Sequence, residues 1–314
     1  MDLISVIIPA YNAEDTIAET LESVVSQSYE NLEILIIDDG STDRTAEIVR
    51  GFSDPRLKLH SFENQGAPAS RNRGIRLAKG EYITLLDADD LWRRDKVEKQ
   101  AAALDANPEA GVVYSFVTYM YENGEKFSRG FRKHYQGDVL RELCIRFFLQ
   151  CGSNGMMRRE VFDRVGYFDE ELDVCDDHDF YLRAAEQYPF ALVPEGQIYY
   201  RLRSGSLSTQ PGKMRRTGHR VIRAAIERNP ELRPVMWEAF AVTDGYVFGK
   251  ALQNPREWRN VVLCVRCLWG HVRAGRAGIR LLLERRGRVG FWMRKIAAWL
   301  MTPGRRPAAS RKGS

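Results

Sequence analysis

The sequence lacks any apolar stretch long enough to cross a membrane. None of its runs reaches the roughly 18 uncharged apolar residues that a spanning helix requires. The first apolar run, residues 3–8, follows Met1 and Asp2 without a basic segment and is too short for the core of a secretory signal. We therefore expect a cytoplasmic protein that is not integral to a membrane.

Cysteine is also scarce, and its spacing does not indicate a disulfide framework. The five cysteines are an odd number and are scattered between residues 144 and 267. Cys264 and Cys267 form a single CxxC without a second pair, inside an amphipathic segment. This placement favours a buried thiol pair, with a metal or redox site as the open alternative.

Two widespread nucleotide-binding signatures are missing as well. No GxGxxG follows an apolar strand, which disfavours a Rossmann dehydrogenase. Residues 270–276 contain two glycines but lack the Lys and the Ser or Thr of a P-loop. No Ser/His/Asp or Cys/His pairing indicates a covalent nucleophile.

What the 314 residues do contain is apolar material for a packed core and an uneven distribution of charge. Hydrophobic residues make up 44% and charged residues 28% of the chain, a composition that excludes disorder as the main state. From Ala251 onward, 15 Lys and Arg face two Asp and Glu, a net charge of +13, so the total of +5 leaves −8 for residues 1–250. An acidic body therefore precedes a basic tail.

The first part of the chain alternates between strand and helix patterns. Apolar runs typical of strands occupy residues 3–8, 32–37 and 82–86, and apolar residues recur at spacings of three and four in 17–25 and 45–49. This alternation predicts βαβ units and a parallel sheet. Because ligands bind beyond the carboxyl ends of such strands, the polar segments that follow the runs are the candidate site.

The pattern changes after Val112. Residues 112–121 are typical of a strand rich in aromatic and β-branched side chains, Asn123-Gly124 indicates a hairpin turn, and residues 177–186 indicate a helix. From Pro211 the chain is expected to be helical and basic. We interpret residues 111–210 as a second half that completes the sheet.

Two acidic segments follow apolar strands. Asp38–Asp43 fits a βα turn with Gly40 for backbone freedom, or a pair of carboxylates that binds a nucleobase or a ribose. Asp87–Asp90 fits an acidic turn, or a DxD that shares Mg²⁺ or Mn²⁺ with a nucleoside diphosphate, because these ions take oxygen ligands.

Four segments in this order, Pro9–Asn12, Asp38–Asp43, Ser70–Gly74 and Asp87–Asp90, resemble the family 2 glycosyltransferases of GT-A fold. The resemblance covers residues 1–210. It implies an α/β catalytic domain with a Rossmann-like, mostly parallel central sheet and flanking helices, in which residues 1–110 bind the nucleotide and 111–210 face the acceptor. It also implies transfer of a sugar from a nucleotide-diphosphate donor with inversion, as in bacterial polysaccharide synthesis.

The resemblance implies specific site residues. Asp89, together with Asp87, would hold Mn²⁺ or Mg²⁺. Tyr11 and Asp39 would line the base pocket with Asp38 beside them. The full set implied for the donor nucleotide is Pro9, Tyr11, Asn12, Asp38, Asp39, Arg71, Asn72, Asp87 and Ala88.

Residues 159–169 and 175–183 resemble the acceptor-side segment of the family, in which an acidic pair opens a helix. Asp177 then matches the catalytic base, and the alternative is that Asp176, Asp177 and Asp179 only cap the helix. Further contacts with the diphosphate or the acceptor are expected from Asp176, His178, Arg201 and Arg203.

Two positions depart from the pattern of the family. Asp176 stands where the family often has Glu, which shortens the reach of the carboxylate by one methylene group. Arg203 stands where the family often has His; an Arg cannot ligate a cation but can pair with phosphate.

The resulting hypothesis is a metal-dependent inverting glycosyltransferase, with a UDP-sugar as the favoured donor and a glycan or lipid-linked acceptor. A positioned carboxylate is required because an acceptor hydroxyl is a poor nucleophile at neutral pH, and a cation would stabilise the departing nucleoside diphosphate. The alternatives are a nucleotidyltransferase, and a catalytically inactive sugar-nucleotide-binding scaffold.

The basic tail has its own pattern. Residues 211–302 form the expected helical extension, and 303–314 are expected to be disordered. Residues 288–301 place Trp, Met and Ile on one helical face with basic residues beside it, which is typical of a helix at an anionic membrane surface. We expect a peripheral protein on the inner face of the cytoplasmic membrane, with packing on protein as the alternative and no nucleic-acid partner.

Overall fold

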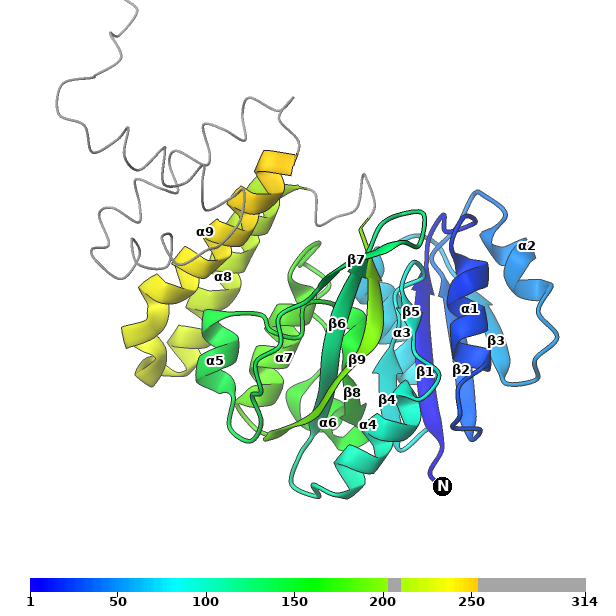
Figure 1. Ribbon diagram of the computed structural model, residues 1–314, viewed down its shortest axis with the longest axis horizontal. Helices are drawn as coiled ribbons and strands as arrows, with labels where there is room; N and C mark the ends of the chain where they lie inside the picture. Colours follow the sequence, from blue (N-terminus) through cyan, green and yellow to red (C-terminus); the bar gives the residue numbers. More distant parts are fainter. Residues whose placement is uncertain (203–209, 254–314) are drawn as a thin grey trace, which may run out of the picture. The chain divides into compact units, whose positions relative to one another are not determined.

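Figure 1 shows the ribbon of the computed structural model, in which residues 1–202 and 210–253 are described. The chain divides into two compact units, Met1–Met236 and Trp237–Ser314, and each is treated by itself. The predictions for Arg203, for the pair Cys264 and Cys267, and for the tail from residue 254 lie outside the described residues.

The first unit is built around one nine-stranded sheet. Its strands are β1 (Ile4–Ala10), β2 (Leu32–Asp38), β3 (Leu57–Ser61), β4 (Tyr82–Leu85), β5 (Leu91–Trp92), β6 (Val112–Met120), β7 (Lys126–Arg129), β8 (Met156–Arg158) and β9 (Phe190–Arg201). They follow the order β3-β2-β1-β4-β8-β6-β9-β5, and β7 pairs with β6.

Most of these strands point in one direction. The first four pair in parallel, β8 runs antiparallel to both β4 and β6, and β9 is parallel to β6. Strands β1, β2, β3, β4, β6 and β9 therefore end at the same edge of the sheet. The predicted α/β fold with a mostly parallel sheet is confirmed.

Nine helices lie in the part of the chain that the structure describes. They are α1 (Ile17–Val25), α2 (Thr45–Arg50), α3 (Ala67–Leu77), α4 (Lys96–Asp105), α5 (Leu140–Ile145), α6 (Arg159–Val165), α7 (Asp176–Ala185), α8 (Pro211–Arg228) and α9 (Met236–Gln253), with the short 3₁₀ turns η1 (Gly152–Asn154) and η3 (Pro230–Val235).

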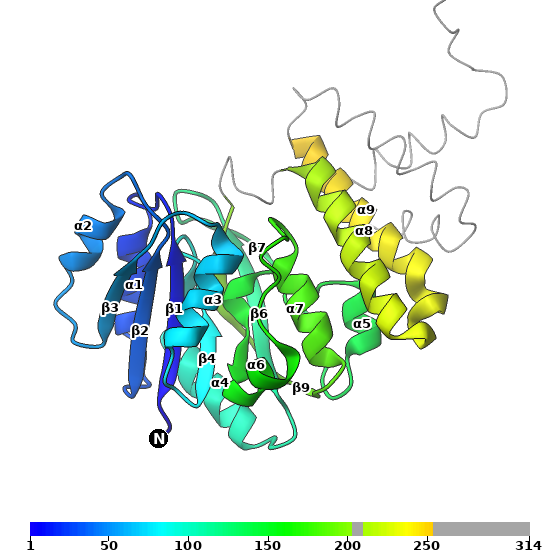
Figure 2. The same cartoon turned by 180° about the vertical axis from the view of Figure 1, so that it is seen from behind.

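Alternation along β1 assigns helices to the two faces of the sheet. Its even-numbered residues Ile4, Val6 and Ile8 pack in one apolar cluster with α1 and α4 (Figure 1). Ile7 and Ile37 face the other way, toward α3 (Figure 2). Successive strand side chains point to opposite faces, so α1 and α4 pack on one side of the sheet and α3 on the other.

The sequence predicted the main elements well. The strands predicted over residues 3–8, 32–37, 82–86 and 112–121 are β1, β2, β4 and β6. The predicted hairpin turn lies between β6 and β7, where Gly124 has a φ of 81°. The sequence did not predict β3, a half-exposed strand at the edge of the sheet with little apolar patterning.

Helical structure begins again at Pro211, the residue from which the sequence predicts it. Helix α8 belongs to the first unit and contacts α7. Within residues 1–202 and 210–253, no helix is both long enough and apolar enough to cross a bilayer.

The packing of α3 on the sheet predicts the effect of one substitution. A Cβ atom at Gly74 would lie 2.3 Å from Cγ2 of Ile7 and 3.2 Å from Cγ1 of Ile37. We expect Gly74→Ala to lower the free energy of unfolding by about 2 kcal/mol, the usual range for an overpacked core, as measured by urea denaturation. The exposed neighbour Leu77 is the control: Leu77→Ala should change it by less than about 0.5 kcal/mol. A loss no larger for Gly74→Ala than for Leu77→Ala would contradict this packing.

Candidate active site

The loops after β1 and β2 are joined to each other. The Oδ1 atom of Asn12 accepts the backbone N–H of Thr42 at 2.8 Å, and the backbone N–H of Asn12 donates to Ser41 Oγ at 3.0 Å. Asn12 holds this position with a φ of 47°. Tyr11 beside it is 53% exposed, so its ring is available to a ligand.

The paired carboxylates at the end of β2 organise the neighbouring backbone. Asp38 accepts the N–H of Ser41 at 3.0 Å. Asp39 accepts the N–H of Gly66 at 2.7 Å and forms an ion pair with Arg73 at 3.1 Å. Both acids are buried. They therefore fix the backbone at Ser41 and Gly66, and their role in donor binding stays a prediction.

Arg71, on α3, lies between two acidic segments that are far apart in the sequence. Its guanidinium pairs with Asp87 at 2.7 Å, directly after β4, and with Asp176 at the start of α7. Burial opposes the charge of Arg71, but the carboxylates of Asp176 and Asp87 outweigh this effect and raise its pKa. The Nε atom of Arg71 is buried and has no hydrogen-bond partner.

Ser153 holds both ends of the acidic loop Asp87–Asp90 through its hydroxyl group. The backbone N–H of Asp87 donates to Ser153 Oγ at 3.0 Å, and this hydroxyl donates to Asp90 Oδ2 at 2.6 Å. Burial, followed by the negative charges of Asp89 and Asp87, raises the pKa of Asp90 well above its ordinary value. Three carboxyl groups are thus gathered in one loop.

Arg201, at the end of β9, contacts the same loop. Its Nε donates to the carbonyl of Asp89 and its Nη1 to the carbonyl of Glu122, both at 2.8 Å. Its Nη2 pairs with the carboxylate of Glu19 on α1. Arg203, the other arginine expected near the diphosphate, lies outside the described residues.

Asp177 lies at the first turn of α7 and is partly exposed. Burial of its carboxyl group, followed by the negative charge of Asp176, raises the pKa of Asp177 to about 7. The carboxylate also accepts the backbone N–H of His178 at 2.8 Å. A carboxyl group with this pKa can accept a proton near neutral pH, which a general base requires.

His178 is directed toward α5. Its Nε2 lies 3.0 Å from the carbonyl of Leu143, and its ring lies against Phe147 with centroids 5.2 Å apart. Burial lowers the pKa of His178 to about 4. The ring is therefore neutral at pH 7, and its Nε2–H donates to a carbonyl that anchors α7.

Asn72 ties the segment before α7 to α3. Its Oδ1 accepts the N–H of Phe168 and its Nδ2 donates to the carbonyl of Phe168, both at 2.9 Å, and Nδ2 also donates to Glu170 at 2.8 Å. The amide of Asn72 is almost completely buried. Asn72 thus lies beside Arg71 but is engaged with the protein itself.

The acidic loop has suitable ligands for a hard cation. Asp87 and Asp89 are each partly exposed at the end of β4. Among the residues that the structure describes, no three His, Cys, Asp or Glu side chains are grouped closely enough to enclose a metal ion. The carboxylate oxygens of Asp87 and Asp89 are of the ligand type that Mg²⁺ and Mn²⁺ take, and such a site would need further oxygens from substrate phosphates.

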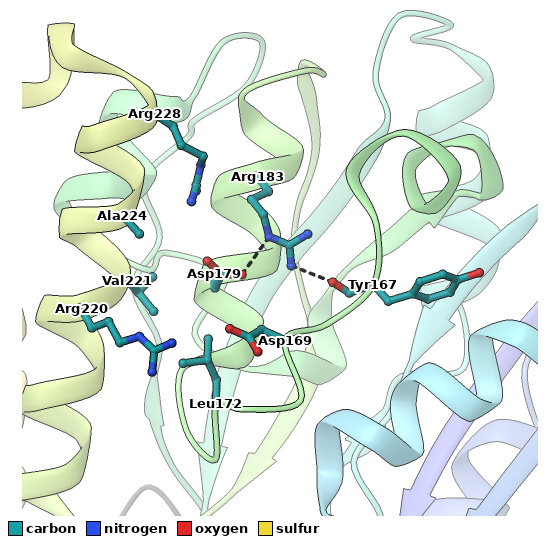
Figure 3. Close-up of a pocket in the computed structure, with 9 residues that line it drawn as sticks. All are labelled: Tyr167, Asp169, Leu172, Asp179, Arg183, Arg220, Val221, Ala224 and Arg228. Atoms are coloured by element: carbon teal, nitrogen blue, oxygen red, sulfur yellow. Dashed lines mark hydrogen bonds and ion pairs between the residues drawn. The ribbon is translucent and has the colours of Figure 1, made fainter.

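A separate cavity of about 290 Å³ lies between the segment before α7, α7 itself and α8 (Figure 3). None of the site residues predicted from the sequence lines it. All three of its arginines are engaged: Arg183 pairs with Asp179 at 2.8 Å, Arg228 with Glu186 at 2.8 Å, and Arg220 with Glu171 at 3.6 Å.

The sequence analysis did not identify several residues that contact the candidate site residues. Ser153 and Glu19 have no local signal, because Ser153 contacts the acidic loop, and Glu19 contacts Arg201, only after distant parts of the chain fold together. Arg73 lies inside the segment Ser70–Gly74 that carries the family resemblance. Its position two residues after Arg71 is the sequence signal that could have indicated it.

The mostly parallel sheet with its flanking helices has the fold of solved GT-A glycosyltransferases. The protein-family model described as glycosyl transferase family 2 matches residues 5–166, and the chain belongs to this family. The glycosyltransferase GlyG of Streptococcus pneumoniae is 31% identical over 236 residues, which cover 66% of this chain and 73% of GlyG.

A second relative carries a more specific name. The E. coli protein WfaP is named as a UDP-Glc:alpha-D-GlcNAc-diphosphoundecaprenol beta-1,3-glucosyltransferase. It is 41% identical over 123 residues, which cover 39% of this chain and 48% of WfaP. The chain thus spans about half the length of WfaP.

Solved structures agree with the fold. TarS residues 1–349 of S. aureus, in complex with UDP-GlcNAc, has a TM-score of 0.66 at 22% identity and covers 85% of this chain and 79% of that chain. The mannosyltransferase PcManGT of Pyrobaculum calidifontis, in complex with GDP-Man and Mn²⁺, has a TM-score of 0.61 at 20% identity, with coverages of 96% and 81%.

The raised pKa of Asp177 predicts a dependence of stability on pH. The folded state binds more protons than the unfolded state between the ordinary value of 3.8 and about 7, so stability falls as pH rises through this window. Asp177→Asn removes this effect and should raise the free energy of unfolding at pH 8 by about 1–2 kcal/mol. A shift of one pKa unit corresponds to about 1.4 kcal/mol, and we expect less than the full shift would give because the side chain of Asp177 is partly exposed to solvent.

Urea denaturation at pH 5 and pH 8 measures this difference. The advantage of Asp177→Asn over wild type should grow between the two pH values. Asp163→Asn, at an exposed position on α6, is the control and should show no such growth. An advantage that is the same at both pH values would rule out the raised pKa.

Proposed function

We propose that this protein is an inverting glycosyltransferase that moves a sugar from a nucleotide-diphosphate donor, with UDP as the favoured nucleotide, to a glycan or lipid-linked acceptor in cell-surface polysaccharide synthesis. The ion pairs of Arg71 with Asp87 and Asp176 carry this proposal. They bring the acidic loop after β4 and the carboxylate-bearing helix α7 to one place, as a single displacement requires.

The donor occupies the edge of the sheet where β1, β2 and β4 end. The exposed ring of Tyr11 offers a face on which the base stacks, with Asp38 and Asp39 beside it. Pro9, Asn12 and Ala88 shape the backbone around the nucleotide, Arg71 borders it from α3, and the buried Asn72 beside Arg71 holds the segment at Phe168.

Asp89 and Asp87 would hold Mn²⁺ or Mg²⁺ together with the diphosphate of the donor. Such a cation would supply positive charge that stabilises the departing nucleoside diphosphate. The complex of PcManGT with GDP-Man and Mn²⁺ supports this assignment by analogy of fold. Loss of Mn²⁺ binding in Asp89→Ala, measured by calorimetry in the presence of UDP, tests it.

Asp177 accepts the proton of the acceptor hydroxyl while that oxygen bonds to the anomeric carbon. Attack on the face opposite the leaving group inverts the anomeric configuration and needs no enzyme nucleophile. The pKa of about 7 lets Asp177 hold this proton at neutral pH. Asp176, through Arg71, fixes the start of α7, and His178 fixes the helix against α5.

The acceptor class rests on the named relatives. WfaP is named for an acceptor linked to diphosphoundecaprenol, and the TarS complex contains UDP-GlcNAc. We infer that this chain also takes a UDP-sugar and an acceptor of the glycan or lipid-linked type. Its basic tail then holds the enzyme against the anionic inner face of the cytoplasmic membrane.

Replacing the proposed base tests the chemistry. Asp177→Asn should lower kcat for sugar transfer by about 10²–10⁴-fold, because the acceptor loses its general base, while binding of UDP stays within about twofold. Wild-type kcat should rise with pH and level off above about pH 7 as Asp177 loses its proton. The assay measures UDP release from UDP-sugars in the presence of Mn²⁺ and undecaprenyl-diphosphate-linked sugars.

Asp163→Asn is the matched control for this experiment and should keep wild-type kcat. Transfer by folded Asp177→Asn at the wild-type rate would overturn the assignment. Release of pyrophosphate instead of UDP would indicate a nucleotidyltransferase. Binding of UDP-sugars without turnover across the acceptor panel would indicate a scaffold protein.

Removing residues 285–314 tests the proposed membrane contact. The shortened protein should lose most of its co-sedimentation with vesicles that contain anionic phospholipid, because several Lys and Arg are removed with the apolar face of residues 288–301. Vesicles of neutral phospholipid are the control and should bind neither protein. Unchanged co-sedimentation of the shortened protein would place the membrane contact elsewhere or exclude it.

A further inference from the structure

Arg201 is an almost completely buried arginine with every side-chain nitrogen engaged. Its side chain is 3% exposed. Nε and Nη1 donate to the carbonyls of Asp89 and Glu122, and Nη2 pairs with the carboxylate of Glu19. The guanidinium therefore presents almost no surface from which a diphosphate could approach it.

The main chain of Arg201 contacts the same acidic loop. Its N–H donates to Asp90 Oδ1 at 2.9 Å. The other oxygen of Asp90 accepts the hydroxyl of Ser153, which in turn accepts the N–H of Asp87. Arg201 thus fixes two successive residues of the loop, Asp89 and Asp90. It is also connected to Asp87 through Asp90 and Ser153.

The start of helix α1 also contacts the backbone of the acidic loop. The hydroxyls of Thr16 and Thr20 donate to the carbonyl of Ala88 at 2.9 and 3.0 Å. Glu19, on the same helix, supplies the carboxylate that pairs with Arg201, although 182 positions separate the two residues. The backbone of the acidic loop is therefore held between α1 and the end of β9.

We propose that Arg201, paired with Glu19, is the positioning residue of the metal loop Asp87–Asp90 and makes no contact with the diphosphate. This inference rests on the proposed function, in which Asp89 and Asp87 share a divalent cation with the donor. The outer partners of metal ligands set their orientation, and their loss typically costs 10–100-fold in metal affinity or activity. The planar fork of Arg201 bonds three acceptors through three different nitrogens in a fixed geometry, whereas Lys offers one compact ammonium on a flexible stem.

The test is Mn²⁺ binding to the full chain, measured by titration calorimetry with saturating UDP. We expect Arg201→Lys to weaken Mn²⁺ binding by about 10–100-fold. UDP binding in EDTA should change by less than about twofold. Saturating Mn²⁺ should restore most of kcat, so that the defect appears in the apparent KM for the metal.

Glu19→Gln is the second variant, since its half-exposed side chain can be changed with little risk to folding. It should weaken Mn²⁺ binding in the same direction by a smaller factor. Glu22→Gln, an exposed position on the same helix, is the matched control and should leave Mn²⁺ binding unchanged. Circular dichroism and thermal unfolding establish that each variant is folded.

Two results would overturn the inference. Folded Arg201→Lys and Glu19→Gln that bind Mn²⁺ like wild type would show that the clamp does not position the loop. Weaker UDP binding in EDTA with unchanged Mn²⁺ affinity would make Arg201 a diphosphate contact. Failure of wild type to bind Mn²⁺ with UDP would instead refute the metal-dependent function, and this inference with it.

Discussion

The buried charge of Arg71 is the constraint on which the site depends. Burying a guanidinium is costly unless it is paired, and removing one partner leaves an uncompensated charge. Arg71 meets this requirement with Asp87 and with Asp176, a residue 105 positions away along the chain. The end of β4 and the start of α7 must therefore approach the same helix, α3. In this way the electrostatics of one side chain place the proposed metal loop beside the proposed base.

Other segments along this edge of the sheet are also held in place by a side chain from a distant part of the chain. Asn12 holds the loop after β2, Asp39 holds the backbone at Gly66, and Asn72 holds the segment before α7. Arg201 does the same for the acidic loop. A site for transfer chemistry gains from such fixed geometry, because misplacement by about 1 Å can lower rates greatly. Several of the polar residues at strand ends therefore hold the backbone of a neighbouring loop.

Burial also sets the two proton equilibria beside the site in opposite directions. It disfavours the charged form of each group, so it raises the pKa of Asp177 and lowers that of His178. The carboxyl group becomes able to hold a proton near neutral pH, whereas the imidazole stays neutral and serves as an anchor. Placing a carboxylate where its charge is disfavoured lowers the stability of the fold, a common consequence of building an active site.

The sequence by itself determined the class of fold, the strands β1, β2, β4 and β6, and the acidic segments that we propose carry the chemistry. Apolar periodicity and the acidic residues after β2 and β4 are local signals, so β1, α1 and the position of Asp89 could be predicted without coordinates. Only the tertiary structure decided how the candidates divide the work. Asn72 and His178 face the protein, Arg201 clamps a loop, and Ser153 and Glu19 enter the site without any local pattern. The reason is physical: whether a polar side chain meets a ligand or a backbone group depends on long-range contacts, which residue type and spacing do not encode.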